Sequence, residues 1–123
     1  MQVSKRNVNK QIEKKIFKAL YQVLADLKRP KDIEMFLEDV LSKTEKTVLA
    51  KRLGIAVYLN KERSYEVIRQ DLKVSSATIA SVQKWLEEDN EGLRLALKAI
   101  EADEWAGEMA SKVSKAVRDV FKK

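Results

Sequence analysis

The chain has 123 residues, of which 45% are hydrophobic and 36% charged, a balance that suits one compact domain with one core. Three glycines and one proline are too few for the turns of a β-sandwich, a barrel or a glycine-rich phosphate loop, so long helices are expected. The absence of histidine and cysteine removes the usual general base, the thiolate nucleophile, disulfides and common metal ligands, which disfavours an enzyme and predicts neither metal nor cofactor.

The first segment is predicted to be a basic helix over residues 8–28, because apolar residues recur there at helical spacing. Residues 1–31 carry nine Lys or Arg and two acids, so the excess behind the net charge of +6 lies here. A basic arm could lie along nucleic acid phosphates, and the alternative is the solvated face of an ordinary helix. The candidate cations are Lys5, Arg6, Lys10, Lys14, Lys15 and Lys18.

Two further helices follow this segment. Pro30 closes the first helix and suits the first turn of the second. Ser42 and Glu45 have the spacing of a capping box, which predicts the start of a third helix that frays near residues 60–63. Gly54 inside this third helix suggests a close approach of another helix.

The rest of the chain is also predicted to be helical, with short helices over 64–72 and 75–88 and a break at residues 89–90. Residues 91–106 and a second amphipathic run ending at Phe121 follow, with Gly107 as a kink or boundary. Trp85 and Trp105 are expected in core or dimer contacts. A single all-α domain over 1–123 is expected, divided into 1–31, 32–88 and a C-terminal extension at 89–123. No apolar stretch is long enough to span a membrane and no signal segment is found, which predicts a cytoplasmic protein.

Residues 64–86 have the pattern of a helix-turn-helix, in which two short helices cross steeply around a tight turn. Ser64 and Ser75 stand where hydroxyls cap the two helices, the latter accepting from the amide of Ala77 or Thr78. The positions that face inward in this geometry are all aliphatic: Ile68, Leu72, Val74, Ile79 and Val82.

Such a motif exposes the start of its second helix, which can enter the major groove of duplex DNA. Lys73 occupies the turn position where glycine is usual, at a cost of about 1 kcal/mol if positive φ is kept. Arg69 stands where a small residue is usual, and its side chain can reach toward a phosphate. The alternative is a helical hairpin without a nucleic acid partner, which the net charge of −1 over residues 64–88 favours. The candidate DNA contacts are Arg69, Lys73, Ser75, Ser76, Ala77, Thr78, Ala80, Ser81 and Lys84.

Phe36 to Leu41, Ser42 with Glu45 and Leu49, Arg52, and Leu72 through Ile79 carry a resemblance to a known family. Through them, residues 33–86 resemble the Trp repressor superfamily of bacterial helix-turn-helix proteins. The resemblance implies an all-α, Trp-repressor-like multi-helix fold that contains a helix-turn-helix, here with additional C-terminal helices. It also implies an intertwined homodimer that binds palindromic sites in double-stranded DNA, with the helix at 8–28 serving dimerisation and the basic N-terminal residues flanking the DNA.

The same resemblance assigns Arg52 to an arginine that binds the tryptophan corepressor, which makes it a possible effector contact. Ser81 and Val82 stand where the corepressor site has an Arg-Gly pair, so tryptophan corepression is not expected. A salt bridge is the alternative role for Arg52. The leading hypothesis is a sequence-specific, homodimeric DNA-binding transcriptional regulator. The alternative is a helical dimerisation or adaptor protein with a vestigial helix-turn-helix, whose apolar C-terminal stripe holds a protein partner.

Overall fold

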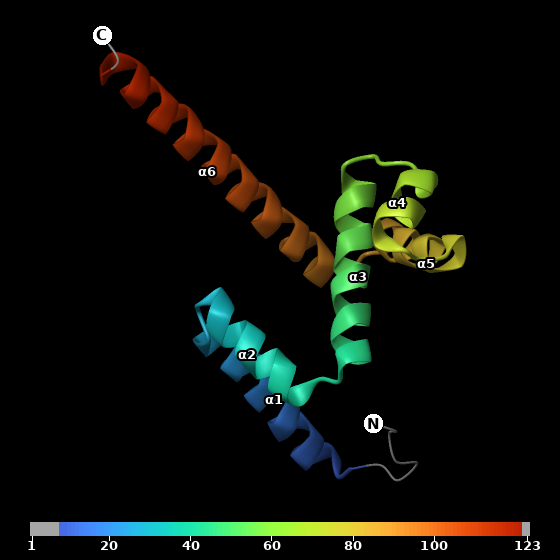
Figure 1. The fold of residues 1–123 in the computed structure, drawn as a ribbon. Helices are drawn as coiled ribbons and strands as arrows, with labels where there is room; N and C mark the ends of the chain where they lie inside the picture. The colour runs from blue at the N-terminus through green and yellow to red at the C-terminus, as the bar shows by residue number, and fades with distance from the viewer. Residues whose placement is uncertain (1–7, 122–123) are drawn as a thin grey trace. The chain divides into compact units, whose positions relative to one another are not determined.

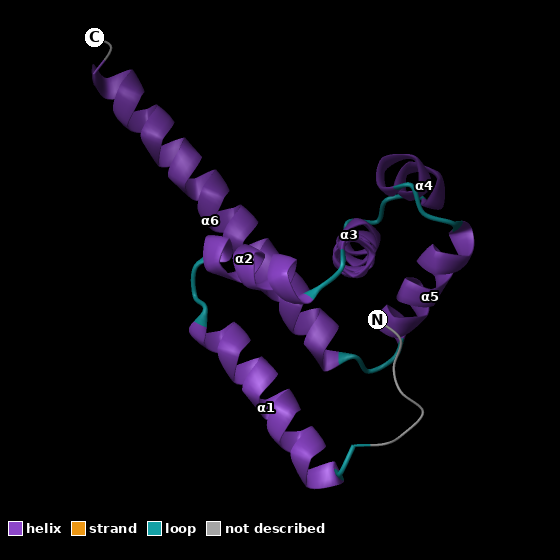
Figure 2. Ribbon diagram, turned by 60° about the horizontal axis from the view of Figure 1, so that its bottom comes forward, coloured by secondary structure: helices purple, strands orange, loops and turns teal. Residues whose placement is uncertain are grey.

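The structure is a computed structural model that describes residues 8–121, apart from the side chains of Trp105 and Phe121. Every regular element in this range is an α-helix (Figure 2). The contacts divide the chain into two compact units, one ending at Thr47 and the other beginning at Val48. The prediction of one domain over the whole chain stays a prediction. Among the described helices, none has both the length and the apolar character needed to cross a membrane.

The first unit contains α1 (Lys10–Asp26), α2 (Pro30–Val40) and the start of α3 (Lys43–Asn60). Asn9 caps α1 by accepting a hydrogen bond from the amide of Gln11 at 2.9 Å. The predicted helix over 8–28 and the start of α2 at its proline are confirmed. Neither α1 nor α2 contains a buried residue. The apolar side chains of α1 are thus largely exposed, and Ile12 and Ile16 are 54% and 55% exposed.

The predicted capping box at the start of α3 is confirmed. The amide of Ser42 donates to the Glu45 carboxylate at 2.8 Å, and the amide of Glu45 donates to Ser42 Oγ at 3.1 Å. Hydrogen bonds from Ser42 hold the pKa of Glu45 below its ordinary value. Two amide groups that would otherwise be unpaired at the helix start are satisfied in this way.

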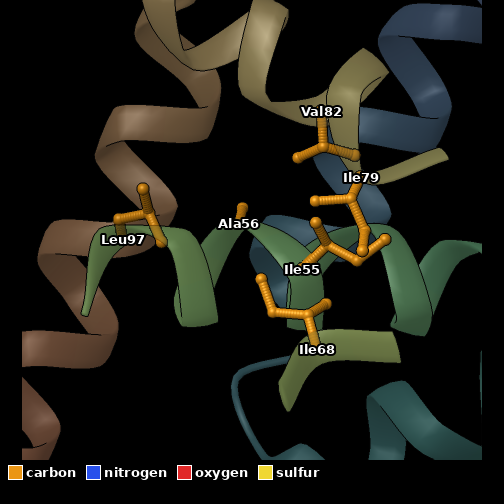
Figure 3. Packing of buried hydrophobic residues seen from close by; sticks show 6 residues of the cluster. All are labelled: Ile55, Ala56, Ile68, Ile79, Val82 and Leu97. Carbon is orange, nitrogen blue, oxygen red and sulfur yellow. The ribbon is translucent and has the colours of Figure 1, made fainter. Parts of the chain in front are cut away.

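The second unit contains the rest of α3, α4 (Tyr65–Leu72), α5 (Ser76–Glu87) and α6 (Glu91–Phe121) (Figure 1). Its core is a cluster of six side chains that draws on all four helices, and each large aliphatic member contributes about 1.5–3 kcal/mol through burial. The members are Ile55, Ala56, Ile68, Ile79, Val82 and Leu97 (Figure 3).

Polar contacts and one glycine fix α4 and α6 on α3. Tyr58 donates to Asp71 at 2.9 Å, which joins α3 to α4. The expected close approach at Gly54 is confirmed, because a Cβ at this position would lie 3.3 Å from Leu72 Cδ1. At the other end of α3, side chains at residues 60 and 61 bind α6: Asn60 donates to Glu101 at 2.6 Å and Lys61 pairs with Glu104 at 2.9 Å.

The predicted break or kink at Gly107 is wrong, because α6 runs without interruption from Glu91 to Phe121. The C-terminal extension is thus one helix, where more than one was expected. A single glycine costs a helix only about 1 kcal/mol relative to alanine, and the alanines and charged residues around it are good helix formers. No neighbour lies within 4 Å of a Cβ built at Gly107.

Candidate nucleic-acid interface

The five aliphatic positions of the predicted helix-turn-helix pack together in one cluster, which we call the hinge. Ile68 of α4 and Ile79 and Val82 of α5 are at most 1% exposed. Leu72 and Val74 are partly buried and pack against the same cluster. Figure 3 shows Ile79 and Val82 of α5 directed toward Ile55 of α3. The buried side of α5 is therefore fixed by the core.

Both predicted caps of the motif are confirmed. Ser64 Oγ accepts from the amide of Val67 at 3.2 Å, and Ser75 Oγ accepts from the amide of Thr78 at 3.2 Å. Lys73, the first residue after α4, has φ 54° and ψ 55°. This left-handed conformation is the one expected for the turn, and a lysine adopts it at a cost of about 1 kcal/mol.

Lys51 on α3 also fixes this turn. Its ammonium group donates to the backbone carbonyl of Lys73 at 3.2 Å. Sequence reasoning missed Lys51, because the contact joins residues 22 positions apart and no local pattern signals it. The bond ties the turn of the motif to the preceding helix.

Four of the predicted DNA contacts share one exposed face of α5. Ala77, Ala80, Ser81 and Lys84 are all exposed and follow the i, i+3, i+4, i+7 spacing of a helix face. They lie opposite the buried hinge positions of the same helix. The structure thus brings these residues together on the side of α5 that faces away from the core.

Most hydroxyl groups at the start of α5 already have partners within the motif. The hydroxyls of Ser75 and Thr78 lie 2.9 Å apart within the cap, and Ser81 Oγ donates to the carbonyl of Ala77 at 3.1 Å. Arg69 donates to Ser76 Oγ at 2.6 Å, so its guanidinium lies beside the first turn of α5. On the exposed face of α5, the alanine methyls and the Lys84 ammonium are not engaged in this way, and Ser81 Oγ can still accept a hydrogen bond.

The cations of this surface are exposed and only weakly paired. Arg69, Lys73 and Lys84 are all exposed. Lys84 lies 4.0 Å from the Glu88 carboxylate, and both side chains are more than half exposed. An exposed pair of this kind contributes about 0–1 kcal/mol, so Lys84 can exchange Glu88 for another anion at little cost.

A shallow cavity of about 370 Å³ lies between α3 and the start of α5. Its charged lining residues are Lys51, Arg52 and Lys73. The salt bridge considered for Arg52 is not found among the described residues. The guanidinium of Arg52 instead lies over the ring of Trp85, 5.7 Å from its centroid.

Some sequence predictions fall outside the described residues, namely Lys5, Arg6 and the side chain of Trp105. Trp85 is expected from the sequence in the core or at a dimer contact. In the structure its side chain is 37% exposed, and the Arg52 guanidinium lies over its ring. Within the described part of the chain, no cluster of three or more acidic side chains is suited to hold a metal ion.

The comparison with known families decides the family of this chain. The sequence model of the Trp repressor protein matches residues 15–101, which is more than half of the chain. The chain belongs to the Trp repressor family. This family is all-α and consists of DNA-binding helix-turn-helix regulators, and it is not an enzyme family. The predicted fold class and family are therefore confirmed. The comparison with curated proteins gave no match.

The Trp repressor family match covers the helix-turn-helix and ends within α6. It includes Arg52, Ser81 and Val82, which were singled out for the corepressor site. Val82 is buried in the hinge at 1% exposure. The last 20 residues of the helix α6, from Ala102 to Phe121, lie beyond the matched region.

Proposed function

We propose that this member of the Trp repressor family is a sequence-specific, homodimeric transcriptional regulator in the bacterial cytoplasm that binds double-stranded DNA and reads the major groove with α5. The observation that carries the proposal is the exposed face formed by Ala77, Ala80, Ser81 and Lys84. The hinge holds the opposite side of α5 in the core, so this face is free to enter a groove.

Base recognition by this face is modest in strength. The methyl groups of Ala77 and Ala80 suit the methyl group of thymine, and Lys84 suits the O6 and N7 acceptors of guanine. The hydroxyl of Ser81 donates within its own helix and is left as an acceptor. Arg69 and Lys73 lie at the edge of the face and are assigned to phosphates, which supply affinity without sequence preference.

A homodimer is supported by the exposed apolar side chains of α1. Ile12, Ile16 and Leu20 are one turn apart on this helix, and all three are exposed. A second copy would remove them from water, in agreement with the role that the family resemblance gives to this helix. Two copies related by a two-fold axis would read half-sites about 34 Å apart in a palindrome.

Tryptophan is not assigned as an effector. Val82 fills its position with a buried side chain, and Ser81 supplies no guanidinium to stack on an indole. Arg52 is already placed over Trp85. These three residues favour DNA binding that does not require tryptophan.

A second candidate function is that of a helical adaptor with a vestigial helix-turn-helix and a protein partner. The net charge of −1 over residues 64–88 favours it, because phosphates attract a positive surface. The exposed apolar side chains in the C-terminal half of α6 favour it as well.

The decisive experiment selects binding sites from a random duplex library. The regulator hypothesis predicts a palindromic consensus with half-sites one helical turn apart. Binding to the selected site is then measured from low to moderate salt for Lys73→Ala and Lys84→Ala. Each variant removes two ammonium groups from the homodimer, so it is expected to flatten the slope of log affinity against log salt by about 1.8 if each ammonium contacts a phosphate. A base contact by Lys84 would in addition relax the sequence preference at one position of the site.

Lys115→Ala is the matched control, because it removes the same charge from an exposed position of α6. It is expected to leave the slope unchanged. Retention of the library no better than by a variant lacking residues 75–86 would refute the regulator hypothesis and favour the adaptor.

A further inference from the structure

The helix α6 carries an unbroken apolar seam with alternating steps of four and three residues. This is the spacing of positions a and d in a heptad repeat, sustained for more than three heptads. We call these eight positions the α6 seam: Leu95, Ala99, Ala102, Ala106, Met109, Val113, Ala116 and Val120.

The α6 seam points away from the core of its own unit. Leu97 is buried against the core, and Glu101 and Glu104 on the same side bind α3. Because a helix turns by about 100° per residue, the seam lies on the opposite side of α6. Leu95 and Val113, two of its members, are 67% and 58% exposed.

The described side chains in the C-terminal half of α6 have no packing partner within their unit. The ion pair between Glu104 and Lys61 lies near the start of this half. Every described side chain from Ala102 to Val120 is exposed. Figure 1 shows this half of α6 extending beyond α3, α4 and α5. Most of the stability of helices in proteins comes from packing of an apolar face, so burial of the seam would stabilise this half of α6.

We propose that the α6 seam packs in parallel and in register against the α6 seam of a second copy, forming a two-stranded coiled coil. The residue types favour this arrangement. Val113 and Val120 occupy position a, where β-branched side chains favour two parallel strands, and Leu95 and Met109 occupy position d. The alanines between them permit close approach of the two helices.

The charges beside the seam suit the same arrangement. In a parallel pair, Lys98 at position g faces Asp103 at position e of the other copy, and the two-fold axis repeats this pairing. Lys112, the next charged residue at position g, faces Val117 of the other copy and meets no like charge. Flanking charges therefore attract in this register.

This surface is separate from the face of α5 assigned to DNA. The family match ends at residue 101, so six of the eight seam positions lie beyond it. The coiled coil holds whether or not the chain binds DNA. Its test can therefore use the full chain without any nucleic acid.

Single-cysteine variants test the proposal directly, because the chain has no cysteine of its own. Val113→Cys places a thiol inside the seam, and Ser111→Cys places one on the outer face two residues away. Under mild oxidation, Val113→Cys is expected to form a covalent dimer on a non-reducing gel at least tenfold faster than Ser111→Cys. Equal rates would overturn the proposal.

The same variants decide the orientation of the helices. An antiparallel pair centred on the seam would separate the two copies of residue 113 by about 16 Å, from 1.5 Å of rise per residue. A disulfide requires Cα atoms about 4.4–6.8 Å apart. Docking of α1 or of another protein on the seam would also prevent this cross-link, so each of these occupants predicts the overturning result.

A charge reversal provides the second measurement. Lys98→Glu in the Val113→Cys background places a glutamate opposite Asp103 of the other copy. Cross-linking is expected to slow about fivefold, which corresponds to the loss of exposed ion pairs. The double exchange Lys98→Glu with Asp103→Lys restores the attraction and is expected to restore the rate. An unchanged rate in the single exchange would overturn the in-register arrangement.

Discussion

The guanidinium carbon of Arg52 lies 5.7 Å from the centroid of the Trp85 ring, so a cation on α3 covers an aromatic ring on α5. The contact joins the helix that precedes the helix-turn-helix to the helix assigned to DNA. The hinge fixes the inner side of α5, and this contact fixes its C-terminal end. The orientation of α5 is thus held at two places within the fold.

A double-mutant cycle measures this contact. Arg52→Ala, Trp85→Leu and the double variant are expected to show a coupling of about 0.5–1 kcal/mol in the free energy of unfolding, since the ring is partly exposed. Urea denaturation supplies the values. Lys115→Ala combined with Trp85→Leu is the control pair and should be additive. Additivity within about 0.3 kcal/mol for the Arg52 pair would show that the contact contributes nothing.

Lys73→Gly separates stability from DNA affinity. Glycine adopts the left-handed conformation without strain, so the variant is expected to raise the free energy of unfolding by up to about 1 kcal/mol. Its carbonyl can still accept from Lys51. The lost ammonium is expected to weaken DNA binding. Lys73→Ala gives the comparison, because it loses the same charge and keeps the strain. A glycine variant no more stable than the alanine variant would contradict the prediction.

The hydrogen bond from Tyr58 to Asp71 raises the pKa of Tyr58 above its ordinary value of about 10. A raised folded-state pKa means that the bond stabilises the fold below the unfolded pKa and that this stabilisation is lost as pH rises through the folded pKa. Tyrosinate absorbance is titrated in the native chain and in Tyr58→Phe, and the difference between the two curves reports Tyr58 alone. Its midpoint is expected above pH 10. Asp71→Ala should return it toward the ordinary value, whereas Glu66→Ala should not. An ordinary midpoint in the native chain would disprove the bond.

Gly54 and Gly107 predict opposite responses to alanine. Gly107→Ala meets no neighbour, so it is expected to favour the local helix by about 1 kcal/mol and to increase helix content in circular dichroism. Gly54→Ala brings a Cβ within 3.3 Å of Leu72 Cδ1, so packing strain is expected to offset the gain in helix propensity. Urea denaturation measures the latter. A full gain of about 1 kcal/mol for Gly54→Ala would show that the two helices are not closely packed.

Local patterns made much of the fold predictable. Ser42 with Glu45, Ser64 and Ser75 marked helix starts because a cap involves residues only three apart. The hinge was predictable as well, since the steep crossing of two short helices fixes its inward positions. The family resemblance and the matched region agree on this part of the chain.

Long-range contacts were not predictable in the same way. The bonds from Lys51 to Lys73 and from Asn60 to Glu101 join residues 22 and 41 positions apart, and no sequence period marks them. The continuity of α6 was missed because a glycine signals a break only when its neighbours also favour one. The positions of Ser75 and Thr78 in the sequence likewise did not reveal that their hydroxyl groups form a hydrogen bond with each other.

The six core side chains of the second unit all lie between Ile55 and Leu97. Contacts so local in sequence favour rapid folding. The core forms within a single chain, whereas pairing of the proposed α6 seam needs a second chain, so folding and assembly are separate steps.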